Sequence, residues 1–279
     1  MEMKPAIVSK TRRGLPLSPD GSRHRINLTW KGISFSVTVR KERRYLLQKL
    51  WGSLEAGQLT AVMGPSGAGK TTLLNILSGF HCKGYEGEIF VNGTTRRRSP
   101  FRKLVSYVMN GHYLLPHLTT RESLCAAAQL KLRPDLTSGE RTQLVERVLS
   151  IWGLEECADT MNNRLSTGQR KRLSVAQELV SNPPLMFLDE PTSGLDSSNS
   201  LQCILTLKAF AARGYTVVCS IHQPSSKIFH LFDKVGRHMN CFATNALPFY
   251  TNVTTSHIPA PCSFFCSRPF SILVAVRPG

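Results

Sequence analysis

Short apolar runs separated by polar turns fill the early part of the chain. Between about Arg25 and Asn92, four such runs have the composition of β-strands: LTW, FSVTV, QLTAVM and GEIFVNG. Two later runs, Leu185–Leu188 and Thr216–Ile221, are almost continuously apolar, which is typical of parallel strands buried on both faces. We predict a helix around residues 197–212 between them. This alternation of strands and helices favours an α/β fold.

Between these two groups of strands the apolar period becomes helical. Thr119–Glu122 and Thr137–Glu140 have the S/T-x-x-E spacing of a capping box, which satisfies free N–H groups at the start of a helix. Leu144, Val148 and Trp152 then recur at intervals of four residues and share one helical face. The pattern therefore predicts a sheet core with a helical insert.

The composition is that of a globular protein with an excess of basic residues. Of 279 residues, 41% are hydrophobic and 19% are charged, and the formal net charge is +17. Residues 1–49 hold 12 Lys or Arg against three acids, a net +9. We interpret residues 1–22 as a flexible basic N-terminal tail, although a basic stretch also suits nucleic acid or an anionic membrane surface. Residues 236–279, with five prolines and no Asp or Glu, are expected to form an irregular C-terminal tail.

Neither the cysteines nor the apolar runs indicate a metal site or a membrane span. The eight cysteines include no C-x-x-C pair and no Cys/His spacing suited to zinc, which fits a reduced, cytosolic setting. No run approaches the roughly 18–20 apolar residues that a membrane helix requires. We therefore expect that the chain does not cross a bilayer by itself and that, taken alone, it is cytosolic.

A glycine-rich segment carries the strongest chemical signal. GPSGAGKT matches G-x-x-x-x-G-K-[ST], follows the predicted strand QLTAVM and opens a predicted helix. In this setting backbone N–H groups cradle phosphates, Lys70 reaches the β- and γ-phosphates, and the Thr71 hydroxyl ligates Mg²⁺. A glycine-rich turn without function is the alternative, which the flanking strand and helix disfavour. The predicted ATP-binding residues are Gly64, Pro65, Ser66, Gly67, Ala68, Gly69, Lys70, Thr71 and Thr72.

Two adjacent acids follow the first of the later buried strands. Asp189 stands at the carboxyl end of the strand in LMFLDEP, where α/β folds gather their ligands and where a carboxylate can bind a metal. Glu190 comes next and is suited to polarise an attacking water. A solvated loop is the alternative, and the presence of a P-loop on the same chain favours the functional interpretation.

Residues 164–184 are predicted to form a capped helix. Ser166 and Gln169 have N-cap spacing, and an apolar stripe follows. The stripe consists of Leu173, Ala176, Leu179 and Val180. A capped N-terminus beside Gly168 and basic side chains is a credible anion site, although an ordinary surface helix fits these residues equally well.

Five ordered motifs resemble the nucleotide-binding domain of ABC transporters and, within that family, the G (white/scarlet) subfamily of half-transporters. The motifs are MGPSGAGKTTLLNIL, YVMNGHYLLPHLTTRESL, LSTGQRKRLSVAQELVSNPP, LMFLDEPTSGLDSS and VVCSIHQPSSKIFHLFDKV. The resemblance covers roughly residues 25–235. It implies a P-loop NTPase of the ABC ATPase type, with a mostly parallel sheet core, an antiparallel β subdomain and an α-helical subdomain. We assign residues 23–235 to this domain, with its helical subdomain at about 110–180.

The resemblance implies a division of roles between two such domains paired head to tail. Gly64–Thr71 is the Walker A loop, and Asp189 and Glu190 are the metal-binding carboxylate and the catalytic base. His222 resembles the switch histidine, a second catalytic residue that holds the γ-phosphate and the attacking water. The signature segment would contact the γ-phosphate bound by the partner; it consists of Ser166, Thr167, Gly168 and Gln169.

Two further positions follow from the same resemblance. Asp196, in the sequence SGLD, resembles the D-loop at the interface between paired domains. Phe35 aligns with the aromatic residue that stacks on adenine, although a phenylalanine of the core fits this position nearly as well. The helical subdomain corresponds to the part of the family fold that contacts the transmembrane half.

The chain departs from the family pattern in three places. Thr167 stands where the signature usually has glycine, and its side chain could crowd the approach of backbone to phosphate. Asn110 replaces the Q-loop glutamine, one methylene shorter, so nucleotide binding, metal coordination or coupling to the membrane half could differ. The resemblance ends near Val235, before the transmembrane domain that the family carries.

The resemblance implies an ATP-binding and ATP-hydrolysing cassette that uses Mg²⁺. Its partners would be a second nucleotide-binding domain and a transmembrane domain that this chain lacks, so it would lie at the cytosolic side of a membrane and energise transport of lipid-like or other small substrates. One alternative is a nucleotide-binding fragment without transport activity. Another is a soluble ABC ATPase acting on nucleic acid, although a single P-loop and the lack of interleaved aromatic and basic residues lead us to expect no nucleic-acid partner.

Overall fold

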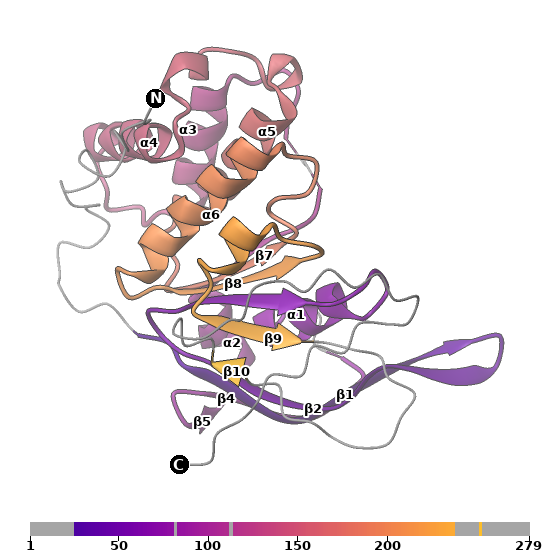
Figure 1. Cartoon of the computed structure of the whole chain (residues 1–279). Coiled ribbons are helices and arrows are strands. Elements are labelled where there is room, and N and C mark those ends of the chain that lie inside the picture. Colours follow the sequence, from indigo (N-terminus) through magenta and orange to yellow (C-terminus); the bar gives the residue numbers. More distant parts are fainter. Residues whose placement is uncertain (1–24, 81–82, 112–113, 238–250, 253–279) are drawn as a thin grey trace.

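The computed structural model describes residues 25–80, 83–111, 114–237 and 251–252, which form two sheets and a group of helices (Figure 1). An antiparallel sheet of four strands has the order β2 (Glu42–Leu54), β1 (Leu28–Val39), β4 (Tyr85–Val91) and β5 (Thr94–Thr95). A six-stranded sheet has the order β10 (Thr251–Asn252), β9 (Lys234–Arg237), β3 (Leu59–Met63), β8 (Thr216–Ile221), β7 (Leu185–Asp189) and β6 (Val105–Val108). Its strands pair in parallel, apart from β10 with β9. The predicted α/β fold, with a mostly parallel core and an antiparallel sheet, is confirmed.

Helices connect the strands, and several begin where the sequence predicts. The helices are α1 (Lys70–Ser78), α2 (Arg98–Arg102), α3 (Thr120–Lys131), α4 (Ser138–Trp152), α5 (Thr167–Leu179), α6 (Ser197–Ala211) and α7 (Ser226–Phe229), with 3₁₀ turns at Glu155–Cys157 and Asn162–Arg164. Capping boxes with both reciprocal hydrogen bonds open α3, α4 and α5. Each box satisfies otherwise free N–H groups at a helix start. The predicted capping residues Thr119, Thr137 and Ser166 are therefore confirmed.

The helix α1 lies between the two sheets. Its apolar side chains pack in one core cluster with Trp30 and Ile33 of the antiparallel sheet and with Phe187 and Val218 of the parallel one. The opposite face of the parallel sheet packs against α3, α4, α5 and α6 in a second cluster. Every residue of β7 and β8 is buried, as predicted from their continuous apolar runs. The parallel sheet is thus covered on both faces, and α1 is fixed beneath it.

A single arginine ties the end of α1 to the antiparallel sheet. The guanidinium of Arg96, just after β5, donates to the carbonyl oxygens of Ile76 at 2.7 Å and Leu77 at 2.8 Å. It also donates to the hydroxyl of Tyr85 at the start of β4, at 3.0 Å. Carbonyls in the last turn of a helix have no partner within the helix, and a cation is favourable there. Arg96 therefore holds the C-terminal end of α1 in place.

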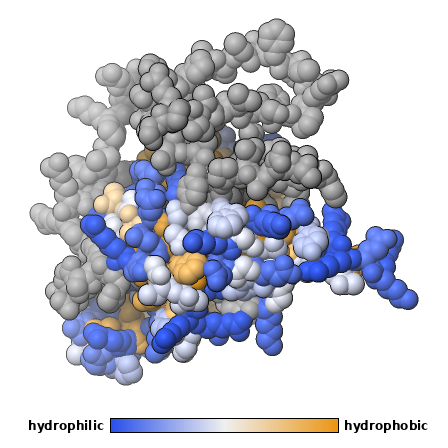
Figure 2. Space-filling model, turned by 90° about the horizontal axis from the view of Figure 1, so that it is seen from below, coloured by the Kyte–Doolittle hydropathy of each residue, from blue (hydrophilic) through white to orange (hydrophobic). Residues whose placement is uncertain are grey.

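The structure differs from the predicted strands in the first part of the chain. LTW and FSVTV belong to one strand, β1, whose pairing with β2 shifts register between Trp30 and Ile33, so the intervening residues form a bulge and not a break. The strand β2 was not predicted, because most of its residues are exposed and its first half is charged. Its hairpin with β1 projects from the molecule (Figure 1). Figure 2, the view from below, shows mainly hydrophilic side chains on this projection.

Strand pairing continues past residue 235, where the domain is predicted to end, and that boundary stays a prediction. The strand β9 runs to Arg237 and pairs with β3, and Thr251–Asn252 pairs with β9. The predicted basic tail 1–22 and the rest of 236–279 lie outside the described residues. Within the part that the structure does describe, no helix has both the length and the apolar character needed to cross a bilayer.

Candidate functional site

The P-loop joins β3 to α1 and leaves the start of this helix open. Gly67 and Gly69 have φ angles of 75° and 94°, a region that residues with a Cβ rarely adopt. Gly69 is the N-cap of α1, and no side chain caps the helix. Its first N–H groups are therefore free to bind an anion, and the helix dipole favours negative charge there. These features fit a phosphate ligand.

Lys70 is the first residue of α1, and its side chain folds back over the loop. It is 5% exposed, and its Nζ donates to the carbonyl oxygens of Gly64 at 2.9 Å and Pro65 at 3.0 Å. These two bonds keep the ammonium at the mouth of the loop, beside the free N–H groups of the helix. The remaining residues of the predicted phosphate-binding set lie in the same turn, with Ala68 buried and Ser66, Gly67 and Thr71 exposed.

The structure brings the P-loop and the first acid of LMFLDEP together. Thr71 Oγ1 donates to Asp189 Oδ2 at 2.9 Å, across 118 residues of sequence. Asp189 ends β7 and is 4% exposed. Its other oxygen, Oδ1, accepts a hydrogen bond of 2.6 Å from Ser220 Oγ on β8. A hydroxyl and a carboxylate at this spacing offer the oxygen ligands that Mg²⁺ prefers.

Glu190 follows at the end of β7 with an unusual backbone conformation. Its φ is 48°, which is left-handed and uncommon for a residue other than glycine. Its N–H donates to Ser220 Oγ at 2.9 Å, and its Oε2 accepts from Asn110 Nδ2 at 2.9 Å. The half-buried Glu190 thus directly follows the buried Asp189 in the chain, and Asn110, at the Q-loop position, bonds to the carboxylate of Glu190.

The signature segment lies in a different part of the molecule. Figure 1 shows α5 in the upper, helical part and α1 in the lower part. Ser166 caps α5 by accepting from the N–H of Gln169, and both Ser166 and Thr167 are exposed. Gly194 lies beside this segment, since a Cβ on that glycine would lie 3.7 Å from the methyl group of Thr167. The signature and the SGLD turn therefore form one exposed surface.

The other predicted site residues are less closely connected to the P-loop. Asp196 caps α6 by accepting from the backbone N–H and side-chain amide of Asn199, and these bonds lower the pKa of its carboxyl. His222 is exposed directly after β8, at the same end of the sheet as Asp189. Phe35 is half-buried on β1 and packs against the core cluster around α1. Its stacking on adenine remains a prediction.

Comparison with known proteins agrees with this geometry. A family model described as ABC transporter matches residues 47–193, more than half of the chain and all of the P-loop, Asp189 and Glu190. The chain belongs to the ABC transporter family. Its fold is that of an ABC ATPase cassette, and it is similar in sequence to members of the G group of this family.

Two curated relatives show how much of a G family member the cassette represents. ABC transporter G family member 1 of Dictyostelium discoideum is 38% identical over 226 residues, which cover 76% of this chain and 28% of that protein. ABC transporter G family member 14 of Arabidopsis thaliana is 37% identical over 249 residues, which cover 86% of this chain and 36% of that protein. The cassette thus spans about a third of the length of these relatives.

Solved structures of a bacterial ABC transporter cassette, MJ0796, have the same fold. A dimeric structure of that protein is 27% identical with a TM-score of 0.67, and the match covers 76% of this chain and 94% of that one. A second structure, of a dimeric post-hydrolysis state bound to ADP and Pi, is 25% identical with the same TM-score and coverage.

Three residues near the acids of this cassette escaped prediction. Ser220 pairs in register with Asp189, and its one sequence signal is a hydroxyl within the apolar strand β8. Lys171 on α5 is 2% exposed; burial lowers the pKa of its ammonium, and the negative charges of Asp189 and Glu190 offset part of this lowering. For Tyr107 on β6, burial and the charge of Asp189 raise the pKa. None has a motif of its own.

Proposed function

We propose that this cassette binds ATP with Mg²⁺ and hydrolyses it, as one half of a head-to-tail pair that drives a transmembrane partner. The observation that carries the proposal is the hydrogen bond between Thr71 and Asp189 at the open start of α1, with Glu190 alongside. A phosphate chain, a metal and an attacking water need these three groups in one place. The structure of MJ0796 with ADP and Pi supports the choice of nucleotide.

The residues of the P-loop and β7 would divide the chemistry between them. Free N–H groups of α1 and the ammonium of Lys70 would bind the phosphates, while Thr71 and Asp189 would hold Mg²⁺ through oxygen atoms. Bound there, Mg²⁺ would neutralise negative charge on the phosphate oxygens. Glu190 would orient and accept a proton from the water that attacks the γ-phosphorus. His222, exposed at the same end of the sheet, would contact the γ-phosphate.

Pairing of two cassettes is proposed because the signature lies in a different part of the chain's own fold from its P-loop (Figure 1). Ser166 and Thr167 are exposed on the helical part of the molecule, so a nucleotide would meet them on a second copy or on a related cassette. The similar cassette MJ0796 has been solved as a dimer, which supports this arrangement. Asp196 and the SGLD turn lie on the same exposed surface and would join the interface.

The pairing is tested by the order of the reaction in protein concentration. With the purified chain and Mg²⁺, ATP turnover per chain should rise with concentration, because each complete site needs two chains. Glu190→Gln should stop turnover and accumulate an ATP-bound dimer, detected by light scattering. Glu88→Gln, which changes an exposed acid on the antiparallel sheet, is the matched control and should remain active. Turnover per chain that is constant at every concentration would contradict pairing, and stimulation by RNA with a steep salt dependence would favour a soluble ATPase.

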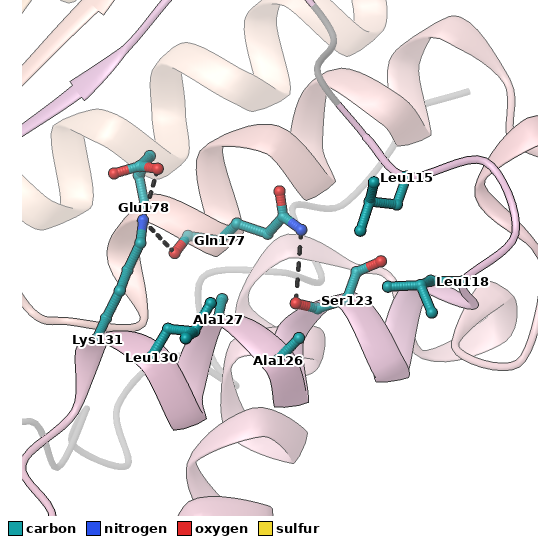
Figure 3. Close-up of a pocket in the computed structure, with 9 residues that line it drawn as sticks. All are labelled: Leu115, Leu118, Ser123, Ala126, Ala127, Leu130, Lys131, Gln177 and Glu178. Atoms are coloured by element: carbon teal, nitrogen blue, oxygen red, sulfur yellow. Dashed lines mark hydrogen bonds and ion pairs between the residues drawn. The ribbon is translucent and has the colours of Figure 1, made fainter.

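A groove between α3 and α5 supports docking of a transmembrane partner on the helical part. Figure 3 shows apolar side chains along the groove, Lys131 and Glu178 at one end, and Gln177 reaching across its middle to Ser123. Leu115 and Leu130 at its rim are 65% and 86% exposed, so the groove presents apolar surface to a partner. Such a surface suits the apolar face of a short helix.

This docking has its own test. Leu130→Asp should weaken co-purification with the co-expressed transmembrane half of a G family relative, while ATP binding stays unchanged. Leu205→Asp is the control, since Leu205 is an exposed leucine on α6 outside the groove. Equal loss of co-purification in the two variants would argue against the groove as the docking surface.

A further inference from the structure

A buried hydroxyl on β8 connects the two acids of the site. Ser220 is fully buried, and its Oγ donates to Asp189 Oδ1 at 2.6 Å while accepting from the N–H of Glu190 at 2.9 Å. A serine hydroxyl has one proton to donate and lone pairs to accept with, so both of these bonds can exist together. One atom therefore contacts the side chain of the first acid and the backbone of the second.

The bond to Asp189 determines which way its carboxylate faces. With Oδ1 held by Ser220, Oδ2 is the oxygen that faces the hydroxyl of Thr71 at the start of α1. A carboxylate bonded at one oxygen has lost the freedom to rotate about its last torsion. Ser220 thus presents the second oxygen of Asp189 to the position proposed for the metal.

The bond to Glu190 supports a strained backbone. Left-handed conformations of residues other than glycine persist where the surroundings hold them, and the φ of Glu190 is 48°. Its N–H is the group that Ser220 accepts from, so the hydroxyl fixes the turn that points the Glu190 side chain out of β7. Asn110 contacts the far end of that side chain, at Oε2. The base is therefore held at its backbone and at its carboxylate.

Among neighbouring residues of β8, Ser220 is the one whose side chain lies on the same side of the sheet as that of Asp189. Ser220 and Asp189 are direct partners in the parallel pairing of β7 and β8, and alternate residues of a strand point to opposite faces. The flanking residues Cys219 and Ile221 pack in the core cluster on the helical side of the sheet. The register of two strands, some thirty residues apart in sequence, thus places this hydroxyl.

We propose that Ser220 is a positioning residue, which couples the orientation of Asp189 to the backbone of Glu190 so that the metal ligand and the base are held together. The inference rests on the proposed ATPase function and adds to it a residue that touches neither nucleotide nor water. Removing a group that hydrogen-bonds to a metal ligand and orients it typically lowers metal affinity or activity about 10–100-fold.

The experiment compares Ser220→Ala with a matched serine. Ser106→Ala removes another buried hydroxyl, on β6, which bonds to the carboxylate of Glu178 outside the site. In Ser220→Ala we expect kcat for ATP to fall about 10–100-fold and the Mg²⁺ concentration for half-maximal turnover to rise, with KM for ATP changed far less. Ser106→Ala should leave all three near wild type. Ser220→Thr, which keeps the hydroxyl, should retain most of the activity.

A second measurement separates positioning from a loss of folding. Ser220→Cys is close in size but is a weak donor, and it should show the same defect with a melting temperature near wild type. In a Glu190→Gln background, which binds ATP without turning it over, Ser220→Ala should still raise the Mg²⁺ concentration needed for ATP binding, because Ser220 also orients Asp189. Full activity of Ser220→Ala with unchanged Mg²⁺ dependence would overturn the inference and leave the ATPase proposal intact. A wild-type chain without ATP turnover would remove both.

Discussion

Replacing Lys70 with alanine should weaken ATP binding while leaving the fold largely intact. The ammonium lies at the mouth of the P-loop, where it donates to the carbonyls of Gly64 and Pro65. A hydrogen bond involving a charged group contributes about 1.5–3 kcal/mol. Loss of the contact to phosphate should therefore raise the Kd for ATP about 10- to 150-fold.

The cost to stability should be much smaller. Gly64 is half-buried and Pro65 is exposed, so water can replace the ammonium at both carbonyls. The side-chain stem of Lys70 is buried, so a decrease of about 1 kcal/mol in the free energy of unfolding is expected. Urea denaturation of the variant and the wild type measures this difference directly.

The binding assay is a calorimetric titration with ATP and Mg²⁺ in a Glu190→Gln background, where hydrolysis does not deplete the ligand. Lys234→Ala is the matched control, because Lys234 is also buried but bonds to Ser53 and Glu55 at the opposite end of β3. That variant should lose stability and keep its affinity for ATP. Equal affinity of Lys70→Ala and the wild type would refute the placement of phosphate at this loop.

Three other changes give distinct outcomes. Gly52→Ala should destabilise the chain by about 1–3 kcal/mol in urea denaturation, because the new Cβ would lie 2.2 Å from the ring of Trp30. Asn110→Ala should lower kcat for ATP about tenfold, because it removes the hydrogen bond that holds the carboxylate of Glu190. The melting temperature should change little, because Asn110 is exposed. Burial lowers the pKa of Lys171, so the unfolded chain binds more protons between that lowered value and about 10.5, and stability rises with pH there. Lys171→Met should remove this rise, measured as the difference from wild type in denaturations from pH 8 to 10; an unchanged slope would contradict it.

Much of the fold could be predicted because its signals are local. The spacing of Thr119 with Glu122 gives a helix start from four residues, and the apolar run Leu185–Leu188 gives a buried strand from four more. The hairpin of β1 and β2 could not be predicted in this way. Its second strand is mostly exposed, so its pairing depends on β1 and not on a pattern of its own.

The candidate site shows the same division. The P-loop and the acids at the end of β7 have local motifs, and the structure places Thr71 against Asp189 as the motifs predict. Ser220 and Lys171 have no such motif. Ser220 lies beside Asp189 because of the register of β7 with β8, and Lys171 lies near the two acids because of the packing of α5. Both depend on residues that are distant in sequence. The roles of the signature, of His222 and of Phe35 remain predictions.

The hydrogen bonds from Arg96 to the end of α1 restrict how this helix can move. The helix is anchored at its tail to the sheet that carries Tyr85, whereas its head opens into the P-loop. Sliding along its axis would break both hydrogen bonds that Arg96 makes to the helix, so α1 and the antiparallel sheet are expected to move together.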